Sequence, residues 1–157
     1  MNSEVVALLC SKKLKVAFAE SCTGGSLAKL ITDVDGSSSC FECGVVSYSN
    51  RIKQKILDVS ENTLKTYGAV SSECAEEMAR GILNISGADI GISVTGIAGP
   101  SGGSEQKPVG TVFIALAVHN KLTVIKHDFS QYKYREKIRE QTCLAALKML
   151  KEELLGT

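Results

Sequence analysis

A serine, a tyrosine and a lysine occur close together in the segment GSSSCFECGVVSYSNRIK, which spans residues 36–53. A serine hydroxyl attacks a carbonyl at neutral pH only when a base removes its proton. A lysine that burial keeps uncharged is such a base, and a tyrosine hydroxyl between the two can relay the proton. Ser38, Tyr48 and Lys53 are therefore candidates for nucleophile, relay and base. Taken singly, Ser38 also fits a helix cap and Lys53 a solvated surface lysine.

The chain offers few other groups for nucleophilic or metal chemistry. Its two histidines, His119 and His127, lie in or beside a late strand-like stretch. Cys40 and Cys43 form a lone CxxC pair, whereas structural zinc sites usually add a second pair or nearby histidines. We expect both thiols to serve apolar packing, and we expect no metal site. A redox or metal module built on this pair is an alternative that thiol titration and metal analysis test.

Two glycine-rich segments follow apolar runs and are candidates for ligand binding. ESCTGG at residues 20–25 lies between a strand and a helix, where backbone N–H groups can point at an anion. A plain turn with glycines at positive φ explains this segment equally well. GIAGPSGGS at residues 96–104 lies where α/β proteins form ligand sites, and we favour a site there over a flexible connector. The residues in or directly before these two segments that are predicted to contact substrate are Ser21, Thr23, Gly24, Gly25, Thr95, Gly96 and Gly99.

Strand-like and helix-like segments alternate along most of the chain. Strands are predicted near residues 15–19, 44–48, 89–95, 110–118 and 122–128, the last two as a β-hairpin. Helices are predicted near residues 4–12, 26–32, 50–57, 60–67, 72–83 and 133–155. The pattern predicts one domain over residues 1–157. Its fold is a three-layer α/β/α sandwich with a mixed, mostly parallel sheet and an antiparallel hairpin edge.

Composition gives no whole-molecule attraction to nucleic acid or lipid. Eighteen basic and seventeen acidic residues leave a formal net charge of +1. The basic run KYREK at residues 133–137 fits a solvated helix face. No apolar run approaches the ~20 residues of a membrane span, and the first residues lack the pattern of a signal peptide. We expect a cytoplasmic protein with reduced cysteines that binds neither nucleic acid nor membrane.

Five segments taken together resemble the CinA C-terminal domain family, which includes stand-alone nicotinamide-nucleotide amidohydrolases (NMN deamidases). In chain order they are AESCTGG, YSN, GAVS, TGIAGP and KPVGT, and the match runs from about residue 5 to 150. The resemblance implies hydrolysis of the carboxamide of nicotinamide mononucleotide (NMN) to nicotinate mononucleotide and ammonia, without a metal or other cofactor. It also implies self-association, as a homo-oligomer of two or more copies.

The resemblance further implies a serine–lysine–tyrosine catalytic set. The serine lies in a GSS turn fifteen residues before the lysine, which corresponds here to Ser38 and Lys53, and the tyrosine opens the YSN segment as Tyr48. Lys53, kept neutral by burial, would accept the Ser38 proton directly or through Tyr48. Backbone N–H groups of the 36–38 turn would stabilise the oxyanion that forms on the amide carbonyl.

The substrate phosphate is expected between the loops at residues 21–25 and 95–103, with Lys107 or Arg135 as its charge partner. The chain departs from the family pattern at residues 129–135, where FSQYKYR replaces a phenylalanine followed shortly by Gly-Asp-Arg. This altered loop favours an alternative in which the domain binds a nucleotide without hydrolysing it. A different amidase or β-lactam-type hydrolase with the same serine–lysine chemistry is a further alternative, which a substrate panel separates.

Overall fold

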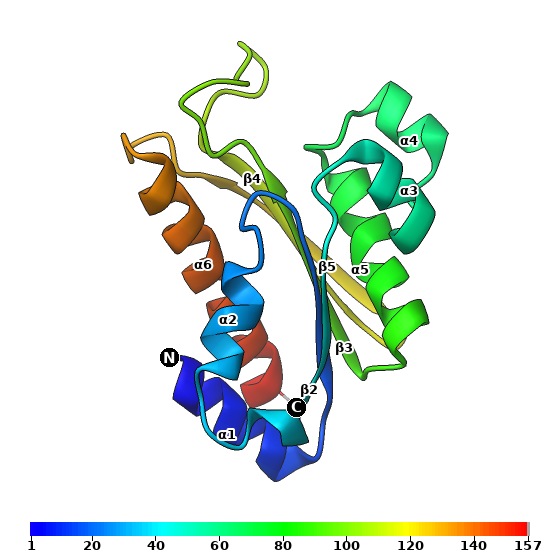
Figure 1. The fold of residues 1–157 in the computed structure, drawn as a ribbon, viewed down its shortest axis with the longest axis vertical. Coiled ribbons are helices and arrows are strands. Elements are labelled where there is room, and N and C mark those ends of the chain that lie inside the picture. The colour runs from blue at the N-terminus through cyan, green and yellow to red at the C-terminus, as the bar shows by residue number, and fades with distance from the viewer. Residues whose placement is uncertain (157) are drawn as a thin grey trace.

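Apolar runs of small and β-branched residues form a five-stranded sheet in the computed structural model, which describes residues 1–156 (Figure 1). Across the sheet the strands lie in the order β2–β1–β3–β4–β5. Their bounds in that order are Phe41–Val46, Val16–Glu20, Ile90–Gly96, Thr111–Val118 and Lys121–Asp128. All five predicted strands are present, although β2 begins three residues earlier than predicted.

Strand directions divide the sheet into a parallel part and an antiparallel edge. Strand β1 pairs in parallel with β2 and β3, whereas β4 runs antiparallel to both β3 and β5. Every residue of β1 is buried, as expected for a parallel strand that helices cover on both faces. The predicted fold class is confirmed. Because β1, β2 and β3 point the same way, their carboxyl ends lie at one edge of the sheet, which we call the carboxyl edge.

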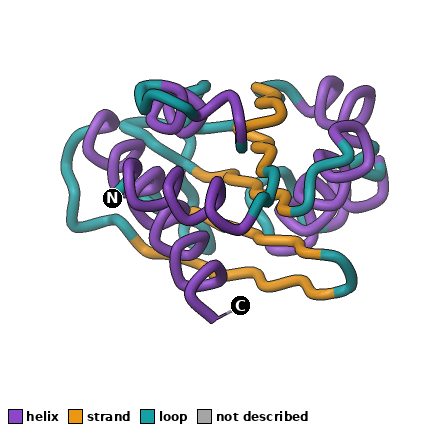
Figure 2. The backbone as a smooth tube through the Cα atoms, turned by 90° about the horizontal axis from the view of Figure 1, so that it is seen from below, coloured by secondary structure: helices purple, strands orange, loops and turns teal. Residues whose placement is uncertain are grey.

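Helices cover both faces of the twisted sheet (Figures 1 and 2). On one face lie α1 (Asn2–Lys12), α2 (Ser26–Thr32) and α6 (Arg135–Gly156). On the other face lie α3 (Asn50–Leu57), α4 (Glu61–Thr66) and α5 (Ser72–Ser86). No helix within residues 1–156 combines the length and the apolar character that crossing a membrane requires.

The helices of the second face begin at serine caps. The hydroxyls of Ser49, Ser60 and Ser71 accept hydrogen bonds from backbone N–H groups three residues later, which satisfies donors that a helix start leaves open. The cap at Ser49 matters for function, since it starts α3 directly after β2 and so turns the first turn of α3 back over the carboxyl edge.

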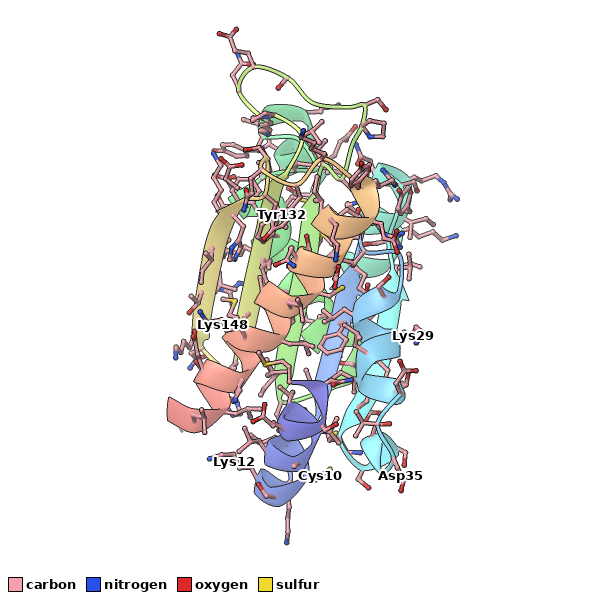
Figure 3. The ribbon with its side chains drawn as sticks, turned by 90° about the vertical axis from the view of Figure 1, so that its left-hand side faces the viewer. Cys10, Lys12, Lys29, Asp35, Tyr132 and Lys148 are labelled. Carbon is pink, nitrogen blue, oxygen red and sulfur yellow. The ribbon has the colours of Figure 1, made fainter. Side chains whose placement is uncertain are left out.

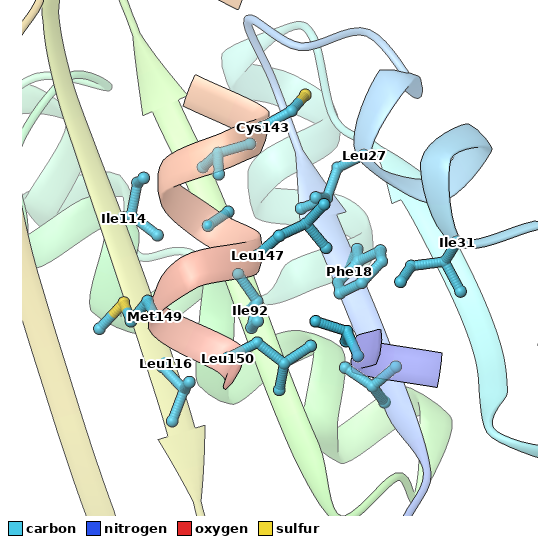
Figure 4. Close-up of a cluster of buried hydrophobic side chains, with 14 of the residues drawn as sticks. Phe18, Leu27, Ile31, Ile92, Ile114, Leu116, Cys143, Leu147, Met149 and Leu150 are labelled. Atoms are coloured by element: carbon cyan, nitrogen blue, oxygen red, sulfur yellow. The ribbon is translucent and has the colours of Figure 1, made fainter. Parts of the chain in front are cut away.

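Two apolar layers fix the helices to the sheet. The main cluster lies between the sheet and the helices α2 and α6, and Figure 4 shows its members Phe18, Leu27, Ile31, Ile92, Ile114, Leu147 and Leu150. On the opposite face α5 buries Met78 and Ile82 against Ala17 and Ala19 of β1. Because the central strands are held on both faces, the loops at their carboxyl ends start from fixed positions.

The CxxC cysteines contribute to packing, as predicted. Cys40 belongs to the main cluster, whereas Cys43 packs against the cluster of the opposite face. All six cysteines are free thiols. Since the two CxxC side chains serve opposite faces of the sheet, they do not form a shared site.

Candidate active site

Lys53 is a buried lysine in the first turn of α3, only 1% exposed. Its Nζ donates to the backbone oxygen of Ser47 at 2.7 Å and lies 3.0 Å from Ser21 Oγ. Within residues 1–156 it has no carboxylate partner at ion-pair distance. Burial lowers the pKa of the ammonium group below its ordinary value, because the charged form loses its hydration. The site therefore favours an uncharged amine beside a serine hydroxyl.

Ser21 follows the last residue of β1, in the centre of the carboxyl edge. Its N–H donates to the Val94 oxygen of β3 at 3.1 Å, and the Ser47 N–H after β2 donates to the Glu20 oxygen at 2.8 Å. These bonds hold the ends of three parallel strands together, with the Ser21 hydroxyl next to Lys53. Ser21, predicted as a substrate contact, thus occupies the position expected of the nucleophile.

Ser38 does not reach this site. It is exposed in the short turn η1 (Ser37–Ser39), which precedes β2, whereas Tyr48 and Lys53 follow β2. A six-residue strand spans about 20 Å, so the two ends of β2 lie at opposite edges of the sheet. Asp35, near the η1 turn, lies at the lower end of the molecule in Figure 3, whereas α3, which follows β2, lies toward the upper end in Figure 1. The predicted transfer of a Ser38 proton to Lys53 does not fit this geometry.

Tyr48 lies at the mouth of the site and not between the serine and the lysine. Its side chain is 59% exposed, and its hydroxyl accepts a hydrogen bond from Arg135 Nη2 at 2.8 Å. Arg135 Nη1 also donates to the Gly99 oxygen at 2.7 Å. The guanidinium thus joins the loops after β2 and β3, and the altered 129–135 loop still brings its arginine to the site. Direct contact between Lys53 and Ser21 leaves no gap for a tyrosine relay.

A cavity of about 270 Å³ opens at the carboxyl edge, where these groups meet. It contains seven of the predicted site residues, namely Ser21, Tyr48, Lys53, Thr95, Gly96, Gly99 and Arg135. Residues that the sequence interpretation missed complete its wall, namely Cys22, Asn50, Ala69, Val70, Ile97, Ala98, Ser101 and Gly102. Asn50 belongs to the YSN segment that supplies Tyr48, and this membership is the sequence signal that could have identified it.

The start of α2 is already occupied by an internal anion. The buried Glu20 carboxylate accepts from the N–H groups of Gly25, Leu27 and Ala28 at 2.9, 3.2 and 2.7 Å, and from the Thr23 hydroxyl at 2.5 Å. Helix starts bind anions through these N–H groups, but here a side chain takes them. The predicted phosphate cradle at residues 21–25 is therefore closed.

Three residues of that turn, which were predicted to contact the substrate, lie outside the cavity wall and maintain the shape of the turn. Thr23 is fully buried on Glu20, and neither Gly24 nor Gly25 lines the cavity. Gly24 has φ +59°, and a Cβ there would lie 3.2 Å from the guanidinium of Arg139. A glycine is needed at this position because the backbone is left-handed and an arginine packs directly against it.

Lys107 lies outside the cavity wall. Its Nζ donates to the backbone oxygen of Tyr67 at 2.5 Å, which ties the long loop between β3 and β4 to the end of α4. Thr95, in contrast, lines the cavity while its hydroxyl donates to the Ala69 oxygen at 2.8 Å. Of the two predicted charge partners for a phosphate, only Arg135 lies at the cavity.

Two backbone N–H groups beside Ser21 are free to bind an oxyanion. Within residues 1–156, the N–H groups of Cys22 and Thr23 donate to no other residue. Cys22 lines the cavity and directly follows Ser21. A donor pair next to a nucleophile is the arrangement that stabilises the tetrahedral intermediate of acyl transfer. The Cys22 thiol itself is a poor nucleophile, because burial raises its pKa to about 11.

Metal-binding side chains do not gather at the site. Within the described residues, no three His, Cys, Asp or Glu side chains form a group that could hold a metal ion. What the cavity offers is a hydroxyl, an amine, backbone donors and a guanidinium. These groups together can carry out acyl transfer from an amide or ester.

Comparison with known proteins identifies relatives along the whole chain. A competence-damage inducible protein from Thermoanaerobacter pseudethanolicus is 51% identical over 156 residues, and a CinA-like protein from Thermotoga maritima is 48% identical over 156 residues. Each alignment covers 99% of this chain but only 37% and 38% of the relative. The chain therefore spans little more than a third of the length of these curated relatives.

Solved structures share the fold closely. The competence/damage inducible protein CihA from Agrobacterium tumefaciens has a TM-score of 0.90 and 39% identity, covering 96% of this chain and 94% of its own. A CinA superfamily protein from Klebsiella pneumoniae has a TM-score of 0.95 and 33% identity, covering 99% and 96%. Residues 1–154 match the family described as the CinA C-terminal domain. The chain belongs to the CinA C-terminal domain family.

Proposed function

We propose that this domain hydrolyses the carboxamide of NMN to nicotinate mononucleotide and ammonia, with Ser21 as nucleophile and Lys53 as general base. The observation that carries the proposal is the 3.0 Å distance between Lys53 Nζ and Ser21 Oγ in a buried site. A lysine without a carboxylate partner loses its proton more easily than a solvated one. The family resemblance supports the choice of substrate.

In the first half-reaction the Ser21 oxygen bonds to the amide carbon while Lys53 takes the hydroxyl proton. The N–H groups of Cys22 and Thr23 bind the resulting oxyanion, an interaction that is commonly worth about 3–4 kcal/mol per donor. The C–N bond then breaks as the Lys53 ammonium returns its proton to the leaving nitrogen, so ammonia leaves and an ester on Ser21 remains. The Ser47 carbonyl holds Lys53 in place throughout, through its 2.7 Å hydrogen bond.

In the second half-reaction water cleaves the ester. Lys53, again neutral, takes a proton from the water, whose oxygen bonds to the acyl carbon. The ester C–O bond breaks, and Lys53 returns the proton to the Ser21 oxygen. The product leaves as its carboxylic acid and loses the acid proton to solvent, which gives nicotinate mononucleotide and restores the starting state. A single base thus serves both half-reactions.

Release of ammonia from NMN in the presence of EDTA tests the proposal. We expect release by the wild-type protein, with nicotinate mononucleotide as the second product in equal amount. Binding of NMN without release would instead support a silent nucleotide-binding domain. Release from other amides or β-lactams but not from NMN would keep the serine–lysine chemistry and change the substrate. We also propose a homo-oligomer, which light scattering of the purified protein tests.

Arg135 is expected to bind the phosphate of NMN. Its bonds to Tyr48 and Gly99 use two of five guanidinium N–H groups, which leaves three for a ligand at the cavity mouth. Charge-assisted hydrogen bonds contribute about 1.5–3 kcal/mol, so Arg135→Ala should raise KM for NMN roughly 10- to 150-fold, with a smaller change in kcat.

Nicotinamide riboside, which lacks the phosphate, is the matched substrate for this prediction. Its kcat/KM should change little in Arg135→Ala, so the preference of the protein for NMN over the riboside should collapse. An equal loss for both substrates would show that Arg135 only holds the loops. Steady-state kinetics with the two substrates decides between these roles.

A further inference from the structure

Two charged side chains hold the turn after Ser21 from opposite sides, and neither of them lines the cavity. Glu20, 1% exposed, accepts hydrogen bonds from three N–H groups at the start of α2 and from the Thr23 hydroxyl. Half-buried Arg139 of α6 donates from Nε to the Cys22 oxygen at 3.1 Å and from Nη2 to the Thr23 oxygen at 2.9 Å. Glu20 thus binds N–H groups that follow the turn, and Arg139 binds carbonyl oxygens within it.

These contacts determine where the free N–H groups point. In a trans peptide the C=O and the following N–H point in opposite directions. Because Arg139 draws the Cys22 oxygen toward α6, the N–H of Thr23 points away from α6. The Ser21 oxygen accepts from the Gly24 N–H at 3.0 Å inside the turn, so the Cys22 N–H points out of the turn. Both free donors are therefore fixed by contacts that hold the two carbonyls.

We infer that Glu20 and Arg139 are positioning residues that set the Cys22 and Thr23 N–H groups as donors for the reaction's oxyanion. The inference rests on the proposed hydrolysis by Ser21. Backbone donors stabilise an oxyanion only when they are oriented before the charge forms, since reorientation during the reaction costs part of the gain. The Glu20 carboxylate on one side of the turn and the Arg139 guanidinium on the other provide this orientation. Neither residue lines the cavity, so neither contacts the substrate.

Two conservative variants test the inference. In Glu20→Gln the amide NH₂ would face backbone donors of α2, and in Arg139→Lys a single ammonium replaces the two-pronged contact with the carbonyls. A misplacement of about 1 Å can cost about 100-fold in rate. We expect kcat for NMN to fall roughly 30- to 100-fold in each variant, with KM within about threefold of wild type. The double variant should lose little more, because both residues act on the same turn.

Glu77→Gln is the matched control. The Glu77 carboxylate caps α4 in a similar way, since it accepts from the Ser60 N–H at 2.7 Å and from the Thr63 hydroxyl at 2.6 Å, outside the cavity wall. This variant should lose comparable stability while its kcat stays within about twofold of wild type. An equal fall of kcat in Glu77→Gln would assign the losses to stability and overturn the inference.

A second readout does not need NMN. An alkyl fluorophosphonate forms a Ser21 O–P bond as fluoride leaves and Lys53 takes the hydroxyl proton, and the phosphoryl oxygen gains charge as the amide oxygen would. Intact-mass measurements should show labelling slowed roughly 30- to 100-fold in Glu20→Gln and Arg139→Lys, but not in Glu77→Gln. Fast labelling of wild type without NMN turnover would refute the proposed substrate only. Equal labelling rates in wild type and folded variants would refute the inference.

Thr23→Val covers the case in which Glu20→Gln fails to fold. It removes one hydroxyl bond to the carboxylate and leaves the three backbone bonds at the start of α2. A partial loosening of the turn should lower kcat and the labelling rate about 3- to 10-fold, with the melting temperature close to that of wild type. Unchanged rates in this variant would contradict the role of Glu20 in orienting the donors.

Discussion

Replacing Ser21 by alanine is expected to reduce NMN hydrolysis by about 10⁴-fold or more, whereas replacing Ser38 by alanine should change it less than about twofold. Ser21 Oγ lies 3.0 Å from Lys53 Nζ, and among residues 1–156 no other hydroxyl has a hydrogen bond with this amine. Ser38 is an exposed residue at the opposite edge of the sheet. The pair is well matched, because both substitutions remove a single hydroxyl.

Kinetics and binding together decide the outcome of this experiment. Ser21→Ala should still bind NMN with about the wild-type dissociation constant, as measured by titration calorimetry, since the hydroxyl contributes little to ground-state binding. Loss of both binding and turnover would point to a collapsed cavity. Full activity of Ser21→Ala together with inactivity of Ser38→Ala would reverse the assignment and require a conformation in which Ser38 reaches the base.

The second large effect is expected at Lys53. Lys53→Met keeps the length of the side chain but removes the base, and we expect kcat/KM to fall about 10³-fold or more. Lys53→Arg should be as inactive, because a guanidinium does not lose its proton. In wild type, kcat/KM should rise with pH through the lowered pKa of Lys53, since only the neutral amine accepts the serine proton. A kcat/KM that shows no rise with pH at any pH below the ordinary pKa of lysine would contradict this assignment.

Stability provides a test of Lys53 that is independent of turnover. Because the Lys53 pKa is lower in the folded protein than in the unfolded chain, the unfolded chain binds more protons between the two values. The free energy of unfolding therefore rises with pH across this window, and the cost of burying the charge is fully present below it. Relative to Lys53→Met, the wild-type melting temperature should increase as pH is raised from 6 toward 10. A constant difference would mean that Lys53 keeps its ordinary pKa.

Much of the architecture and part of the site could be predicted from the sequence. Apolar runs and helical patterns indicated the strands and the helices, because both signals are local. Tyr48, Lys53, Thr95 and Arg135 were also predicted, and they gather at one cavity. Each of these four lies near the end of a strand or in the first turn of a helix at the carboxyl edge, where parallel strands bring distant residues together.

The prediction that Ser38 lies beside Lys53 was wrong because closeness along the chain was given too much weight. Ser38 and Lys53 are 15 positions apart, but an extended strand between them carries the chain across the whole sheet. Ser21 is 32 positions from Lys53, yet both follow the carboxyl ends of neighbouring parallel strands. The predicted strand order along the chain was enough to exclude Ser38 from the carboxyl edge. Ser38 precedes its strand, so it lies at the opposite edge of the sheet.

The sequence also did not predict that the Glu20 carboxylate takes the N–H groups at the start of α2. Capping side chains usually come from the residue that directly precedes the helix, and here that residue is Gly25, which has none. The anion comes instead from Glu20, at the end of a strand whose other residues are all apolar. A lone carboxylate at the end of a buried strand, followed by a glycine cap, is the pattern that predicts such an internal anion.

The bond between Arg139 and the Thr23 oxygen has a consequence for the synthesis of the protein. It joins residues 116 positions apart, so the turn around Ser21 cannot reach its final form until most of the chain has been translated. At 5–20 residues per second, this interval is on the order of 10 s. For most of that time a nascent chain already contains Ser21 and Lys53 but lacks Arg139, which holds the two carbonyls of the turn after Ser21. The turn after Ser21 therefore takes its final form late, with the docking of α6, and not with the formation of the sheet.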